Sequence, residues 1–147
     1  MAVIKQVDAT SSVIINSDDI LYVADDVDII TTIGTALFIS NINSATTSEV
    51  HNFGDIVALS GDAVDFDAEG TSFFNHGTVV AGSRRAAFDV DDKVHIQNFG
   101  LVQSSDNEAV HFGSVSDKQG SVMRRRLGRI RGKLLRGDCP ERPNYLD

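Results

Sequence analysis

The sequence predicts an all-β fold, a short parallel β-solenoid, and three observations lead to it. The tripeptide Asn-x-Gly recurs with a period of 23 residues, and a fixed period of this size is typical of stacked repeats. Short apolar runs bounded by Gly, Asn, Asp and Ser predict strands and turns. Apolar and polar residues alternate within these runs, which places the apolar side chains on one face. The three copies are Asn52-Phe53-Gly54, Asn75-His76-Gly77 and Asn98-Phe99-Gly100.

Each repeat has the same internal order: Asn-x-Gly, a short apolar strand, a polar turn, and a second strand at residues 63–66, 86–90 or 109–112. One rung cannot bury its apolar face alone, but stacking on the next rung at about 4.8 Å pairs the strands and closes a core. In such a stack the three asparagines would form a side-chain ladder. The glycines fit corners that need a positive φ or a close approach of two backbones.

The N-terminal third fits earlier and less regular turns of the same coil. Terminal repeats are commonly atypical because they cap a stack. The whole chain is therefore expected to form about four or five rungs. The short strand signals in this part of the chain are residues 13–16, 20–23, 27–30 and 36–40.

Charge divides the chain of 147 residues into two parts. Residues 1–117 carry 4 Lys and Arg against 18 Asp and Glu, a net charge of −14. Residues 118–147 carry 9 Lys and Arg against 3 Asp and Glu, a net charge of +6, and also hold the single Cys and both Pro. We predict a solenoid domain at 1–117 and, at 118–147, a basic tail that is disordered or non-native.

Several classes of protein are not expected. A single Cys, Cys139, allows no internal disulfide framework and no Cys-based zinc site. No apolar run approaches the roughly 18 residues of a membrane-spanning helix. The first residues, Met1 to Thr10, lack a basic segment followed by an apolar one, so no N-terminal secretory signal is visible.

The motif Asn-x-Gly, an Ile/Val strand, then Ala-x-Gly resembles the repeats of bacterial autotransporter-type passenger domains over about residues 13–116. It is also similar to the β-helical segments of large secreted proteins that carry repeats-in-toxin calcium motifs, although this chain has no Gly-Gly-x-Gly-x-Asp nonapeptide. The resemblance implies a right-handed parallel β-helix on a secreted or cell-surface protein. It also implies a structural or adhesion-type repeat module, with surface glycans as one class of partner.

Calcium is the one cofactor that the residues suggest. Asp65-x-Asp67-x-Glu69-Gly70 matches the first half of an EF-hand loop, in which alternate oxygens line the ion. The twelfth position is His76 instead of a bidentate Glu, so a complete EF-hand is not expected. Asp65, Asp67 and Glu69 are therefore candidate ligands of a calcium site on a solenoid corner. The alternative is that these carboxylates only solvate an outward strand face.

A carbohydrate-active β-helix is the enzymatic alternative, and otherwise no catalytic activity is expected. Glycosidases need two carboxyls at a defined separation, and Asp65, Asp67, Asp89 and Asp91 are predicted on one face of adjacent rungs. Sugar-binding sites favour aromatic platforms, but the chain has no Trp. Phenylalanines such as Phe38 are expected in the core.

The remaining candidates concern histidines and partners. The histidines do not share one register at the 23-residue period, so a metal-binding histidine ladder is not expected. The basic tail hints at weak binding to nucleic acid or anionic membranes, and no other nucleic-acid contact is predicted. An unpaired strand edge at the end of the stack predicts self-association.

Overall fold

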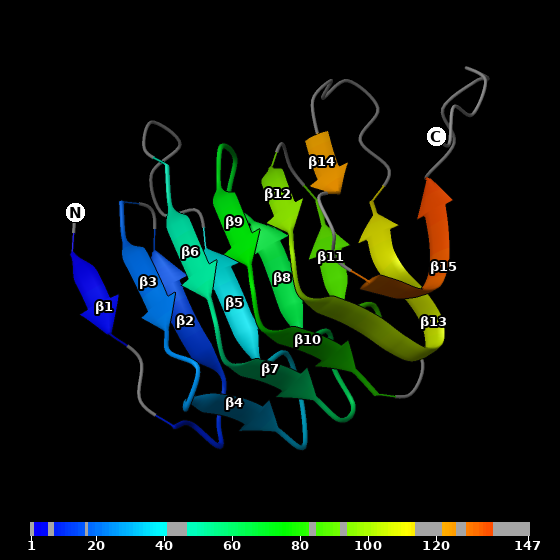
Figure 1. Ribbon diagram of the computed structural model, residues 1–147, viewed down its shortest axis with the longest axis horizontal. Helices are drawn as coiled ribbons and strands as arrows, with labels where there is room; N and C mark the ends of the chain where they lie inside the picture. Colours follow the sequence, from blue (N-terminus) through cyan, green and yellow to red (C-terminus); the bar gives the residue numbers. More distant parts are fainter. Residues whose placement is uncertain are drawn as a thin grey trace.

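The computed structural model is a parallel β-solenoid in which four successive turns each have three sides (Figure 1). β1 lies at one end of the coil and β15 at the other, as the colours from blue to red show in Figure 1. The predicted fold class is thereby confirmed: the described elements are strands, and each pairs in parallel with its neighbours. The structure describes residues 2–5, 8–16, 18–40, 47–82, 85–91, 94–113, 122–125 and 129–136.

One side of the coil is a sheet of six strands in which every neighbour comes from the next turn. A parallel neighbour that returns only after a full turn is the defining pairing of a solenoid. In spatial order the strands are β1 (Val3–Lys5), β3 (Ile20–Val23), β6 (Glu49–Asn52), β9 (Ser72–Asn75), β12 (His95–Asn98) and β14 (Val122–Arg125).

The other two sides are joined through one long strand, β13 (Leu101–Phe112), which runs along both. Its first residues pair with β10 (Thr78–Ala81), which continues the side formed by β4 (Asp28–Thr31) and β7 (Asp55–Ala58). Its last residues pair with β11 (Phe88–Val90) on the third side. The other strands of that side are β2 (Val13–Asn16), β5 (Leu37–Ser40) and β8 (Val64–Asp67).

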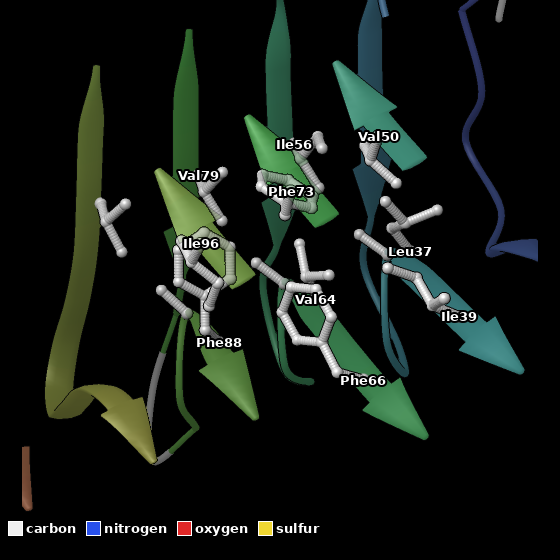
Figure 2. Close-up of a cluster of buried hydrophobic side chains, with 14 of the residues drawn as sticks. Leu37, Ile39, Val50, Ile56, Val64, Phe66, Phe73, Val79, Phe88 and Ile96 are labelled. Carbon is white, nitrogen blue, oxygen red and sulfur yellow. The ribbon is translucent and has the colours of Figure 1, made fainter. Parts of the chain in front are cut away.

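The core occupies the inside of the coil, because apolar residues alternate with polar ones in register from turn to turn. Val50, Phe73 and Ile96 are in register on β6, β9 and β12, and all three are buried. Figure 2 shows these side chains pointing inward toward Phe66 and Phe88 from the opposite side. The rings of Phe66, Phe73 and Phe88 pack edge-on or tilted, with their centroids 5.2–5.6 Å apart. This aromatic cluster joins β8 to β9 and β11 of the following turn.

The predicted asparagine ladder is present inside the coil. Asn52 Nδ2 donates a hydrogen bond to Asn75 Oδ1, and Asn75 Nδ2 donates to Asn98 Oδ1, each at 2.8 Å. All three side chains are buried. The same Nδ2 atoms of Asn52 and Asn75 also donate to the backbone oxygens of Thr78 and Leu101, at 3.3 and 3.2 Å. The ladder therefore fastens β6 to β10 and β9 to β13 around the corner.

The glycine after each asparagine is needed for close approach rather than for a positive φ. A Cβ atom on Gly77 would overlap the carbonyl oxygen of Gly54, and one on Gly100 would overlap that of Gly77. Neither glycine is among the residues with positive φ, which include Gly34 and Gly70. The Asn-x-Gly phrase thus marks a corner at which the backbones of successive turns approach each other closely.

One expected core residue lies elsewhere. Phe38 is only partly buried and is in register with Asp65 on the outward face of β5. Leu37 and Ile39, its neighbours in sequence, point into the core instead. The strict two-residue alternation of a strand decides this placement, whereas hydrophobicity alone suggested burial.

The segment predicted as a basic tail contains two of the described strands. β14 pairs in parallel with β12, and β15 (Arg129–Arg136) pairs in parallel with β13. The parallel strand pairing therefore continues past residue 117. The domain boundary at 117 and the non-native origin of the tail stay predictions. Across the described ranges, no helix is long and apolar enough to cross a membrane.

Candidate functional site

A row of polar side chains runs along the outside of the third side of the coil. Asp65 of β8, Asp89 of β11 and His111 of β13 occupy the same register in successive turns. Since parallel strands are about 4.8 Å apart, the two carboxylates are held close to one another by the backbone itself. The repeat therefore places two acids and one imidazole side by side without any specialised loop.

The two aspartates of this row have altered acidity. Partial burial, followed by the charges of Asp89, Asp91 and Asp62 and then of Asp67, raises the pKa of Asp65 from 3.8 to about 6. Burial also raises the pKa of Asp89, with Asp62 and Asp91 adding to the increase, while His111 and Arg85 oppose it. A carboxyl with a pKa near 6 can both hold and release a proton near neutral pH.

Next to this row lies a polar hollow with a volume of about 320 Å³. It opens on the surface where the turn before β11 meets β13. Its polar lining combines three carboxylates with a guanidinium, an amide and an imidazole. We call it the polar hollow and define it by Asp62, Arg85, Asp89, Asn107, Glu108 and His111.

The carboxylates of the polar hollow differ in their partners. Asp62 accepts a hydrogen bond from the backbone N–H of Ala86 at 2.9 Å, and Arg85 Nη1 lies 3.6 Å from Asp62 Oδ2. Asp89 Oδ1 is buried and, among the described residues, has no hydrogen-bond partner. Glu108 is only 8% exposed. Asp62 thus holds the loop at Ala86, while Asp89 Oδ1 keeps unused acceptor capacity.

The structure separates the three candidate calcium ligands. Asp65 and Asp67 both face outward on β8, whereas Glu69 lies in the turn that follows, next to Gly70 with its φ of 81°. In the part of the chain that the structure describes, no group of three His, Cys, Asp or Glu side chains is arranged to hold a metal ion. Calcium binding by Asp65, Asp67 and Glu69 stays a prediction.

Two stacks of aromatic rings were not predicted from the sequence. His51 lies between Tyr22 and Phe74 with ring centroids 4.8 and 4.9 Å away, and His51 Nε2 contacts Glu49 Oε1. His76 lies in the same way between Phe53 and Phe99, at 4.9 and 4.6 Å. Three of these four contacts join ring residues of different types at an offset of 23 residues, which a search for identical histidines overlooks.

The inner rings of these stacks are poor sugar platforms, because stacking along the coil covers both faces of His51 and of His76. Recognition of a sugar by an aromatic side chain uses the ring face. Tyr22, at the end of one stack, is 40% exposed. The stacks hold successive turns together on the outside of the coil.

Comparison of the chain with protein-family models, with curated proteins and with solved structures found no match.

Proposed function

We propose that this chain is a structural repeat module of adhesion type, belonging to a secreted or cell-surface bacterial protein and without catalytic activity. The observation that supports it is the unbroken hydrogen-bonded asparagine ladder, which joins three consecutive turns inside the coil. A buried ladder of this kind makes a stiff rod whose inward positions are fixed and whose outward positions are free to vary. The resemblance to autotransporter-type passenger repeats and to the β-helical segments of repeats-in-toxin proteins supports the same role.

Adhesion is tested with beads that carry the purified chain, presented to a surface coated with bacterial or host glycans. Tyr22 is 40% exposed at the end of an aromatic stack, so Tyr22→Ser removes apolar surface without opening the core. Asp26→Asn, in an exposed turn of the same part of the coil, is the matched control. We expect retention to fall with Tyr22→Ser only. Retention equal to that of beads coated with an inert protein would contradict the adhesive role.

A carbohydrate-active role is the second candidate, favoured by the raised pKa of Asp65 and by its register with Asp89. A proton-holding carboxyl beside a second carboxyl is the arrangement that glycoside hydrolysis uses. The test is release of reducing ends from acidic polysaccharides, which Asp65→Asn and Asp89→Asn should both abolish. Absence of any turnover by the unmodified chain would dismiss this candidate.

Calcium binding is proposed on the same row of acids, because mutual repulsion of Asp65, Asp67 and Asp89 would be relieved by a cation. Calorimetric melting in calcium and in chelator tests it. A rise in melting temperature with calcium that is lost in Asp67→Asn supports the site, and an unchanged temperature counts against it.

Self-association through the ends of the coil is the proposed partner interaction. At the first turn β1 pairs only with β3, and β2 only with β5, among the strands that the structure describes. An open parallel edge is a template for a second chain. Light scattering over a range of concentrations tests this, and a monomer at every concentration would argue against it.

A further inference from the structure

Glu108 is the most unusual residue of the polar hollow. It is only 8% exposed and lines the hollow. A largely buried carboxylate is unfavourable unless it is paired, so proteins normally give such a group a partner or a use. Its backbone position is fixed in β13, between the residues that pair with β10 and those that pair with β11.

A second acceptor faces the same space. Asp89 lines the polar hollow from β11, and its Oδ1 atom is buried without a partner among the described residues. Asn107 adds an amide, which can accept and donate, from the residue next to Glu108. The hollow therefore offers three acceptor groups from two adjacent strands.

The charge of the polar hollow is unbalanced. Among the described residues that line it, three carboxylates, those of Asp62, Asp89 and Glu108, face one guanidinium, that of Arg85. Arg85 Nη1 lies 3.6 Å from Asp62 Oδ2, and the charge of Arg85 also acts on Asp89. A ligand that completes this site carries positive charge and several hydrogen-bond donors.

We propose that the polar hollow binds a protonated primary amine, whether carried by an alkylamine or by an amino sugar. An ammonium group has three donors and no acceptor, which complements the Asp89 Oδ1 atom and the acceptor oxygens of Glu108 and Asn107 that line the hollow. A metal ion fits less well, because no described group of three His, Cys, Asp or Glu side chains is arranged to hold one. The volume of about 320 Å³ lies at the small end of ligand pockets, which suits a single sugar ring or a short alkyl chain.

The experiment follows the backbone and side-chain amide NMR signals of the full chain during titration with n-butylammonium at pH 7 and low ionic strength. Tetramethylammonium, which has the same charge but no N–H donor, is the matched ligand. Glucosamine and N-acetylglucosamine form a second pair that differs in the ammonium group, and this pair separates an amino sugar from a simple alkylamine as the source. We expect saturable shifts at Asn107 and His111 with the two ammonium ligands and not with their partners.

The variants test whether the carboxylates act as assigned. Glu108→Gln keeps the shape of the side chain and should weaken butylammonium binding about tenfold, the effect of one lost charged hydrogen bond. Asp89→Asn should weaken it by a similar factor and serves as the second variant if Glu108→Gln does not fold. Asp26→Asn, distant from the hollow and exposed, should leave binding unchanged. Circular dichroism melting verifies that each variant is folded.

Two outcomes would overturn the proposal. One is equal binding of butylammonium and tetramethylammonium, and the other is full affinity in both Glu108→Gln and Asp89→Asn.

Discussion

Two rows of like side chains run along this coil, one buried and one facing outward, and they differ in what the backbone repeat does to them. Inside, Asn52, Asn75 and Asn98 join through hydrogen bonds of 2.8 Å. Outside, Asp65 and Asp89 occupy the same register on neighbouring turns, and burial together with the charge of Asp89 raises the pKa of Asp65. The amide carries both a donor and an acceptor and so pairs with a copy of itself, whereas two carboxylates have only acceptors and repel.

In a solenoid, a residue that recurs at the same position of each turn lies next to copies of itself, so its attraction or repulsion toward its own kind is repeated at every turn. A self-complementary side chain gains a partner with every added turn, and it is therefore suited to the interior. A repeated acid gains a like charge with every added turn and needs solvent, protonation or a cation. The outward row is therefore the part of the coil on which we propose that other molecules bind.

Asn75→Asp makes the two rows alike and has the largest expected effect. The change removes the Nδ2 donor to Asn98 Oδ1 and to the Leu101 backbone oxygen and places an acceptor in a site with 0% exposure. We expect a loss of about 4 kcal/mol in the free energy of unfolding at pH 7, measured by urea denaturation. Asn16→Asp, the same change at an exposed position, should alter it by less than about 0.5 kcal/mol. Equal losses in the two variants would contradict the ladder.

Gly77→Ala tests the spacing between turns on which both rows depend. The added Cβ overlaps the Gly54 carbonyl oxygen, which accepts a 2.9 Å hydrogen bond from the N–H of Thr78. We expect unfolding to become easier by about 2 kcal/mol, the usual effect of overpacking at a tight backbone contact. Leu59→Ala, at a half-exposed corner of the neighbouring turn, is the control in the same denaturation series. A stable Gly77→Ala variant would mean that the turns lie farther apart than described.

Asp65→Asn removes one negative charge from the outward row and should stabilise the protein. Because the pKa of Asp65 is raised to about 6, the folded protein binds a proton more tightly than the unfolded chain. The carboxyl therefore lowers stability as the pH rises from about 4 to 6, and the deficit is complete above pH 6. We expect Asp65→Asn to add about 1 kcal/mol at pH 7, after allowance for solvent screening, and nothing at pH 4. Thermal unfolding at both pH values measures this, and a pH-independent difference would refute it.

The sequence predicted the inside of the coil better than the outside. The 23-residue period fixed which residues stack, so the strands around Asn52 and Asn75, their ladder and the core position of Phe66 all followed from local alternation. Phe38 was misplaced because hydrophobicity was weighed above alternation.

The polar hollow could not be predicted, because it depends on how one irregular stretch meets a regular row. β13 runs through the corner that separates two strands in the earlier turns, and its pairing with β15 shifts register between Gln103 and Glu108. Glu108 and Asp89 both line the hollow, and no periodic pattern of the sequence relates the two residues. The aromatic stacks around His51 and His76 were not predicted for a simpler reason: their members differ in residue type.

The most direct test of the stacked coil is the NMR spectrum of the three asparagine side chains. The fold requires nuclear Overhauser effects between the Nδ2 protons of Asn52 and the side chain of Asn75, and between those of Asn75 and Asn98, with hydrogen exchange far slower than in an unfolded chain. Asn107, on the outward side, should exchange quickly. Side-chain protons of Asn75 that exchange as fast as those of Asn107, with no cross-peak to either neighbour, would contradict the stacked coil.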